Sequence, residues 1–245
     1  MADPIFEDSR LVAIYDSFDG ERRDLVHYIE LIKELGSRSV IDVGCGTGCL
    51  STLMAREDLE VVGIDPAKAS LDFARTKPFS DKVRWICGDV DALQSSLSAD
   101  LAVMTGNVAQ VFLSDDSWLR TLFCLRSALA KHGHLVFEVR DPSKKAWLNW
   151  NRDDTFQRIN VPRIGWVQGW CEVISVTDQL VQFKWSYLFE SSNNLVSSLS
   201  TLRFRERIEI EKSLWESGFE VKEVRDAPDR PGQEFVFVAK VAESE

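Results

Sequence analysis

The feature that most constrains the fold is a regular alternation of short apolar runs and helical repeats between residues 40 and 140. Strands that alternate with helices pair in parallel and are covered by helices on both faces of the sheet. We therefore predict an α/β fold: a doubly wound, mostly parallel seven-stranded sheet with helices on both faces. The predicted strands are 40–43, 61–64, 83–86, 101–104, 135–139, 219–224 and 235–239, and the predicted helices are 48–57, 66–76, 115–130 and 206–217. In helix 115–130 we expect Leu119, Leu122, Phe123 and Leu129 to share one apolar side.

The pattern changes at both ends of this region. Residues 1–36 form a predicted N-terminal helical segment that stops at Gly36. Residues 143–204 lose the helical period, and a two-residue alternation of apolar and polar side chains covers 181–189. This predicts an antiparallel β insertion after the fifth strand, between the two parts of the core, 37–142 and 205–245.

Composition and charge narrow the classes of function. The 245-residue chain has a formal net charge of -10, which disfavours binding to a phosphate backbone, so we expect no nucleic-acid partner. Five scattered cysteines without a C-x-x-C pair suggest neither a disulfide framework nor a metal site. No apolar stretch approaches the length of a membrane span, and the acidic start MADPIFEDSR does not fit a secretory signal. We expect a cytoplasmic protein with no membrane partner; the oligomeric state is left open.

The strongest chemical signal is the segment VIDVGCGTGCL at 40–50. An apolar strand runs into a glycine-rich turn and then a helix, whose N-terminus offers unpaired N–H groups to a ligand. The spacing is G-x-G-x-G, unlike the G-x-G-x-x-G of dinucleotide sites. Asp42 lies two residues before the first glycine, where its carboxylate suits an ammonium group better than a diphosphate. The candidate contacts in this segment are Asp42, Gly44, Cys45, Gly46, Thr47 and Gly48.

Two further acids follow the next two predicted strands. Asp65 ends the second strand and can accept hydrogen bonds from ribose hydroxyls, or it can be the N-cap of a helix that starts at Pro66. Asp89 follows the third strand and can accept from an adenine amino group while the Val90 N–H donates to a ring nitrogen; it can also be a turn or cap residue.

With these motifs, residues 36–142 and 206–241 resemble the class I, seven-strand S-adenosylmethionine-dependent methyltransferases. The resemblance implies S-adenosyl-L-methionine as cofactor. It implies that the glycine turn contacts the methionine part, that Asp65 and the adjoining Pro66 hold the ribose, and that Asp89 and Val90 hold the adenine. It also implies that the segment after the fourth strand passes beneath the reactive methyl group, which makes Thr105, Gly106, Asn107 and Gln110 candidates. Tyr15 is a candidate for an aromatic that closes over the cofactor, or packs on its helix.

The acceptor is narrowed by motifs that are missing. The chain lacks the Asn/Asp-Pro-Pro-aromatic tetrapeptide of DNA amino-methylating enzymes, the Pro-Cys of cytosine-C5 enzymes and the paired-glutamate loop of protein arginine methyltransferases. A small-molecule acceptor remains. Glu138 and Arg140, at the end of the fifth strand, are candidates for acid–base or substrate-binding roles, although Arg140 can instead pair with Asp141.

The insertion at 143–204 is predicted to be a substrate lid. Trp147 and Trp150 are the candidate pocket aromatics, and the alternating aromatics at 183–189 can serve only to pack the lid on the core. We therefore expect in-line transfer of a methyl group to a small molecule. Two alternatives stay open, a non-catalytic S-adenosylmethionine-binding module and an NAD-dependent oxidoreductase.

Overall fold

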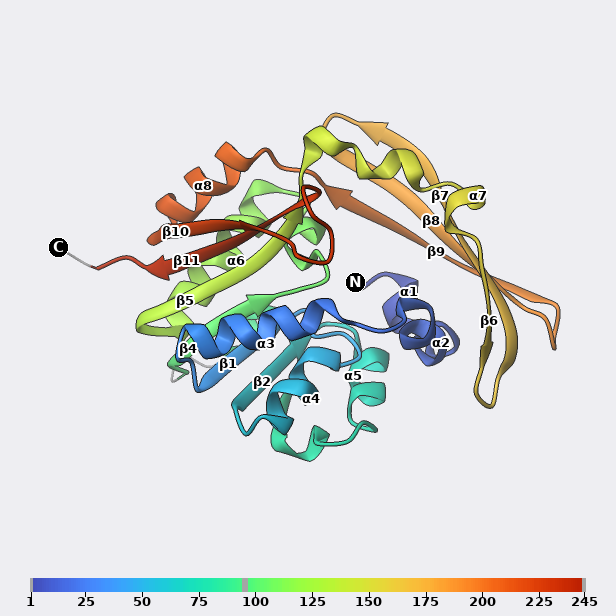
Figure 1. Ribbon diagram of the computed structural model, residues 1–245, viewed down its shortest axis with the longest axis horizontal. Coiled ribbons are helices and arrows are strands. Elements are labelled where there is room, and N and C mark those ends of the chain that lie inside the picture. Colours follow the sequence, from blue (N-terminus) through green and yellow to red (C-terminus); the bar gives the residue numbers. More distant parts are fainter. Residues whose placement is uncertain (1, 94–96, 244–245) are drawn as a thin grey trace.

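The computed structural model describes residues 2–93 and 97–243, and its main feature is a seven-stranded sheet (Figure 1). The strand order is β10-β11-β5-β4-β1-β2-β3. β1 pairs in parallel with β2 and β4, while β11 is antiparallel to both β5 and β10. The predicted fold class is confirmed. The strands are β1 (Ser39–Val43), β2 (Glu60–Asp65), β3 (Val83–Cys87), β4 (Ala99–Met104), β5 (Leu129–Arg140), β10 (Phe219–Asp226) and β11 (Glu234–Val241).

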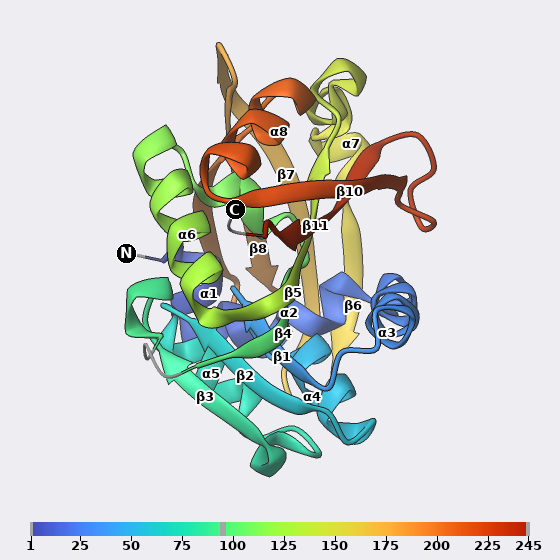
Figure 2. The same ribbon diagram turned by 90° about the vertical axis from the view of Figure 1, so that its left-hand side faces the viewer.

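Helices cover both faces of this sheet, as Figure 2 shows from the side. α3 (Asp24–Glu34) and α4 (Cys49–Arg56) bury their apolar sides on one face, and α6 (Asp115–Ala128) and α8 (Arg207–Glu216) bury theirs on the other. Successive residues of β1 alternate between the two cores: Val40 packs on the first side and Ile41 on the second. Burial on both faces explains why the central strands β1 and β4 are largely apolar. α5 (Lys68–Ala74) follows β2.

The predicted apolar side of α6 was partly wrong. Trp118, Leu122 and Leu125 are buried, at intervals of four and three residues, whereas Phe123 is 50% exposed. Leu129, expected on the same helix, is the first residue of β5. The large Trp118 side chain is buried in the core with Leu122 and Leu125, one turn and two turns further along the same side of α6, and its indole N–H donates to Ser213 Oγ on α8 (2.8 Å).

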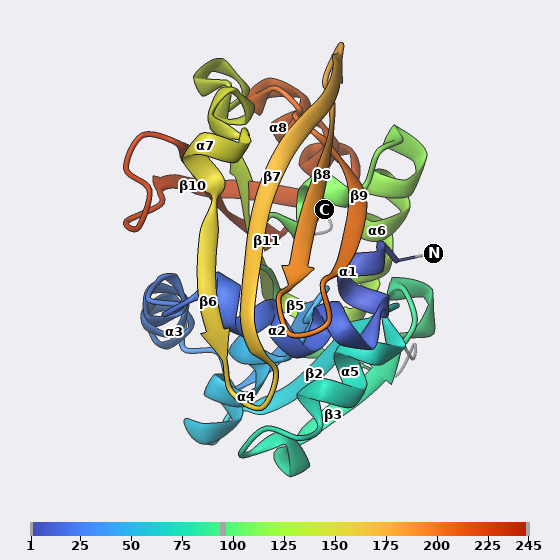
Figure 3. The ribbon, with the colours of Figure 1, turned by 90° about the vertical axis from the view of Figure 1, so that its right-hand side faces the viewer.

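The insertion after β5 forms a separate four-stranded antiparallel sheet in the order β6-β7-β8-β9 (Figure 3). Its strands are β6 (Gln157–Val161), β7 (Gly165–Thr177), β8 (Leu180–Phe189) and β9 (Asn194–Arg203). They are preceded by the short helices η4 (Pro142–Lys144), η5 (Ala146–Asn149) and α7 (Arg152–Thr155). The antiparallel insertion inferred from the two-residue period is confirmed.

The N-terminal segment joins the two sheets. It divides into α1 (Pro4–Glu7), α2 (Ser9–Asp19) and α3, with the break between α2 and α3 at Gly20, which has φ +72°. Ile5, Leu11 and Ile14 pack against Val167 and Tyr187 of the antiparallel sheet. The N-terminal helices therefore lie between that sheet and the core (Figures 1 and 3).

The topology concentrates loops at one edge of the main sheet. The chain moves from β1 outward to β2 and β3, then crosses back to β4 and β5 on the other side of β1. At such a reversal, the loops after the two central strands separate and leave a crevice at their carboxyl ends. The glycine turn after β1 and the segment after β4 both lie there. Among the described residues, no helix is long and apolar enough to cross a membrane.

Candidate cofactor and acceptor site

The glycine turn after β1 is built from three glycines with left-handed backbones. Gly44, Gly46 and Gly48 have φ values of +68°, +53° and +77°. A Cβ on Gly44 would lie 2.6 Å from Val108, and one on Gly48 would lie 2.6 Å from Trp85, so protein packing excludes a side chain at both positions. A Cβ on Gly46 would meet nothing within 4 Å. Gly46 is therefore the glycine that leaves room for a ligand.

Asp65, at the end of β2, is bonded to this turn. Its Oδ2 accepts from the Gly46 N–H (2.8 Å) and its Oδ1 accepts from the Ala67 N–H (2.7 Å). The alternative role of Asp65, as N-cap of a helix that starts at Pro66, is not found, because α5 starts at Lys68 and has Ala67 as its N-cap. Burial raises the pKa of the Asp65 carboxyl, and the two backbone donors oppose that rise. Each oxygen keeps a lone pair for a further donor.

Asp89 follows the carboxyl end of β3, at the same edge of the sheet as the glycine turn and Asp65. Its carboxylate accepts from the Asp91 N–H (3.1 Å) and caps the short helix η2 (Val90–Ala92). Asp89 and Pro66 are exposed, whereas Val90 is buried. The cap uses one carboxylate oxygen, Oδ1, and leaves the other for a ligand.

Asp42, inside β1, is buried and accepts a hydrogen bond from Ser51 Oγ (2.6 Å). Burial raises the pKa of Asp42 to about 7, although the Ser51 hydroxyl lowers it. Burial also raises the pKa of the neighbouring Cys45 thiol well above its usual range. A carboxylate with so little water around it is poised to gain from a cation.

Two residues that the sequence analysis missed connect α2 to the glycine turn. Thr47 Oγ1 donates to Asp16 Oδ1 (2.6 Å), and Lys77 Nζ lies 2.6 Å from Asp16 Oδ2. Asp16 follows Tyr15 on α2, and burial raises the pKa of the Tyr15 phenol. No local pattern links Asp16 with Thr47 and Lys77, because each lies on a different element.

The backbone of the segment after β4 is hydrogen-bonded to the side chain of Glu138 on β5. Glu138 Oε1 accepts from the N–H groups of Gly106 (2.7 Å) and Asn107 (3.2 Å), and its Oε2 accepts from the Tyr28 hydroxyl. Burial raises the pKa of this carboxyl. Since these bonds engage both oxygens, Glu138 positions the segment that contains Thr105, Gly106 and Asn107.

Gln110 connects the same segment to both sheets. Its Nε2 donates to the Arg203 carbonyl at the end of β9 (3.2 Å), and its Oε1 accepts from the Arg140 N–H on β5 (3.2 Å). Gln110 is buried, so the segment after β4 and the antiparallel sheet are joined beside the site.

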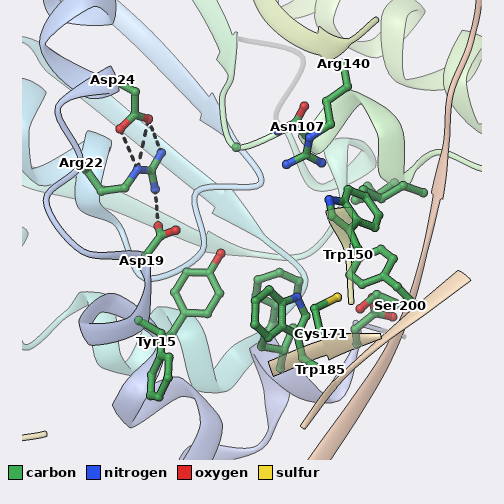
Figure 4. A pocket seen from close by; sticks show the side chains of 18 of the residues that line it. Tyr15, Asp19, Arg22, Asp24, Asn107, Arg140, Trp150, Cys171, Trp185 and Ser200 are labelled. Carbon is green, nitrogen blue, oxygen red and sulfur yellow. Dashed lines mark hydrogen bonds and ion pairs between the residues drawn. The ribbon is translucent and has the colours of Figure 1, made fainter. Parts of the chain in front are cut away.

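A cavity of about 420 Å³ lies between this edge of the core, the N-terminal helices and the inner side of the antiparallel sheet. Figure 4 shows the Tyr15 hydroxyl and the Arg140 guanidinium directed into it from opposite sides. Gly106 and Asn107 line the cavity, but the glycine turn does not. The turn and the cavity are thus neighbouring regions that meet at the segment after β4.

The two candidate tryptophans lie differently. Trp150 lines the cavity and packs edge-on against Phe183, with ring centroids 4.8 Å apart. Trp147 is not among the lining residues and packs edge-on against Phe204 at 4.6 Å.

The expected pairing of Arg140 with Asp141 was wrong. Arg140 Nε lies 3.5 Å from Glu234 Oε1, because the antiparallel register of β5 and β11 places the two residues opposite each other. Asp141 instead accepts from the Ser143 N–H and caps η4. Burial lowers the pKa of the Arg140 guanidinium, which Glu234 opposes, and an arginine stays charged at neutral pH.

Comparisons with known proteins agree with this geometry. Residues 40–133 match the family described as a methyltransferase domain. A cypemycin N-terminal methyltransferase from Streptomyces is 26% identical over 147 residues, which span 59% of this chain and 60% of that relative. A methyltransferase structure from Clostridium acetobutylicum superposes with a TM-score of 0.78 at 17% identity, covering 96% of this chain and 99% of that one.

The structure of an amino pentose methyltransferase from Micromonospora echinaspora, with S-adenosylmethionine bound, also superposes. Its TM-score is 0.73 at 17% identity, and 96% of each chain is covered. The chain contains a methyltransferase domain at residues 40–133 and shares the fold of S-adenosylmethionine-dependent methyltransferases. At these identities the solved structures show a shared fold.

The different surroundings of Gly44 and Gly46 predict opposite effects of adding a methyl group. Gly46→Ala places its Cβ in open space and costs about 1–2 kcal/mol for the left-handed backbone, so the protein should fold. Its affinity for S-adenosylhomocysteine should fall at least about tenfold, or 1.4 kcal/mol. Gly44→Ala should lower the melting temperature much more, because its Cβ collides with Val108. Thermal unfolding and calorimetry measure both effects; wild-type affinity in Gly46→Ala would contradict the assignment.

Proposed function

We propose that this methyltransferase transfers the methyl group of S-adenosyl-L-methionine to a small-molecule acceptor by in-line displacement. The observation that carries the proposal is the bond between the Asp65 carboxylate and the Gly46 N–H, made where the glycine turn has open space. This arrangement fits a nucleoside with an amino-acid tail. The cavity beyond the segment after β4 is of the size that small ligands occupy.

In this proposal the cofactor lies along the carboxyl edge of β1, β2, β3 and β4. When bound, S-adenosylmethionine supplies a methyl group activated by a positive sulfur. Asp65 and the adjoining Pro66 hold the ribose, and Asp89 with Val90 holds the adenine. The tail lies against Asp42, Tyr15 and the segments Gly44–Gly48 and Thr105–Gln110, including Cys45, Gly46, Thr47, Gly106 and Asn107. The Asp16–Thr47 bond keeps α2 over this region.

The residues around the cavity contribute to catalysis mainly by positioning the acceptor. Holding the acceptor about 3 Å from the methyl group and in line contributes roughly 7–11 kcal/mol, without covalent participation by the protein. Glu138 fixes the backbone of Gly106 and Asn107 and so sets the boundary between cofactor and acceptor. The insertion at 143–204 is proposed as the lid over the acceptor, mounted on the core at 37–142 and 205–245 and braced by residues 1–36. Trp150 and Arg140 belong to the acceptor wall.

The role of Asp65 can be tested with Asp65→Asn. Wild-type protein should bind S-adenosylhomocysteine with micromolar affinity and show no binding of NADH in calorimetry. The Asn side chain directs an NH₂ group at either the Gly46 or the Ala67 N–H and accepts ribose bonds more weakly. Affinity for S-adenosylhomocysteine should fall at least about tenfold, and the melting temperature should also fall.

Asp72→Asn is the matched control, because Asp72 is an exposed acid on α5 that pairs with Lys68 and Arg75 at the surface. Its affinity should equal that of the wild type. NADH binding without S-adenosylhomocysteine binding would overturn the proposal, as would an Asp65→Asn protein that binds like wild type.

The pKa of Asp42 predicts a pH dependence of cofactor binding. This pKa, about 7, is above the value of an exposed Asp, so the folded protein favours the protonated form and Asp42 lowers stability as the pH rises from 4 through 7. A cofactor ammonium beside Asp42 favours the ionised form. Affinity for S-adenosylhomocysteine should therefore rise about tenfold to thirtyfold between pH 5.5 and 7.5, with proton release.

Calorimetry at several pH values, in buffers of different ionisation enthalpy, measures both the affinity and the released protons. Asp42→Asn should remove most of the dependence, which separates Asp42 from the raised pKa of Asp65. An unchanged pH profile in Asp42→Asn would place the ammonium elsewhere.

A further inference from the structure

Arg140 presents an incompletely paired cation to the cavity. Its side chain is 21% exposed and lines the cavity, and within the described ranges no side-chain hydrogen bond holds the guanidinium. Its nearest acid is Glu234, whose Oε1 lies 2.6 Å from Arg230 Nη1 and is therefore already engaged. The face of Trp150 lies 5.1 Å from the guanidinium carbon. A charge held this far from water gains strongly from an anionic ligand.

Asn107, which lines the same cavity, presents an unpaired hydrogen-bond acceptor. The residue is 4% exposed, and Oδ1 has no hydrogen-bond partner among the described residues. The Asn107 backbone is left-handed, with φ +63°, and its N–H donates to Glu138, which fixes the position of the residue beside the cavity. A buried carbonyl oxygen without a donor destabilises the protein, and a ligand N–H that reached it would remove that cost.

The charges around the cavity favour a ligand that carries both groups. Six acids and four arginines line it. Three of those arginines are already paired: Arg22 bonds Asp19 and Asp24 (Figure 4), Arg23 bonds Glu21, and Arg230 pairs with Asp229 and Glu234. An excess of acids opposes a dianion such as a phosphate monoester and tolerates a monoanion with an amine.

We infer that the methyl acceptor is a small amino carboxylate, with its carboxylate on Arg140 and its amine N–H on Asn107 Oδ1. This inference rests on the proposed function and names the substrate class of the same site. Because Asn107 lies where the cofactor region meets the cavity, the amine is the group that is methylated. The neutral amine lone pair forms the N–C bond as the S–C bond of S-adenosylmethionine breaks. S-adenosylhomocysteine leaves, and the methylated ammonium gives one proton to water.

The test uses probes in matched pairs. Phenylalanine and 2-aminobenzoate are compared with their carboxamides, and glucosamine and glucosamine 6-phosphate represent neutral and dianionic amines. Binding to protein saturated with S-adenosylhomocysteine is followed by calorimetry, and transfer from radiolabelled S-adenosylmethionine is measured separately. We expect at least one amino carboxylate to bind and be methylated, at least tenfold better than its amide and than either sugar.

Two variants assign the contacts. Arg140→Gln should reduce binding of the carboxylate probe at least tenfold and abolish the preference over the amide, while Arg140→Lys should keep part of it. Asn107→Gly suits the left-handed backbone and should lower transfer while keeping the preference for the carboxylate. Arg207→Gln, at an exposed arginine on α8 that pairs with Glu211 and does not line the cavity, is the control and should match wild type.

The outcomes separate the inference from the proposed function. A wild-type protein that fails to bind S-adenosylhomocysteine would refute the proposed function. A protein that binds S-adenosylhomocysteine but prefers the amides or the sugars, or takes none of the probes, would refute the inference alone. Retained carboxylate preference in a folded Arg140→Gln protein, with wild-type affinity for S-adenosylhomocysteine, would also refute it.

Discussion

A single buried carboxylate, that of Glu138, joins the parts of the molecule that border the site. It accepts from two backbone N–H groups after β4 and from the Tyr28 hydroxyl on α3. Placing a carboxylate in the interior is costly unless its oxygens are well bonded, and here three donors offset that cost. The backbone of Gly106 and Asn107 is thereby fixed at the boundary between the glycine turn and the cavity.

The N-terminal helices connect the glycine turn of the core with the antiparallel sheet. α2 is bonded to the glycine turn through Asp16 and Thr47, and the N–H of Ile5 on α1 donates to Ser198 Oγ on β9 (2.9 Å). The antiparallel sheet therefore rests on helices that also touch the proposed cofactor region. The contacts of Asp16 at the glycine turn and of Ile5 at β9 thus lie on neighbouring helices of one short segment.

The sequence predicted the features that are encoded locally and missed those that depend on distant partners. Strand and helix alternation, the glycine turn and the period of 181–189 are properties of neighbouring residues, and they gave the fold class. Arg140 shows the limit: its sequence neighbour Asp141 was the expected partner, but the register of β5 with β11 supplies Glu234 instead. Tyr28 and Glu138, 110 residues apart, meet only after the sheet has formed.

A crystal structure of the protein with S-adenosylhomocysteine tests the central claim most directly. The account predicts the ribose hydroxyls on Asp65 and the amino-acid tail along Gly44–Gly48 beside Asp42. It also predicts that the sulfur faces Asn107 and the cavity, so that a methyl group on it would point toward an acceptor. A ligand bound elsewhere, or a sulfur directed away from the cavity, would contradict it.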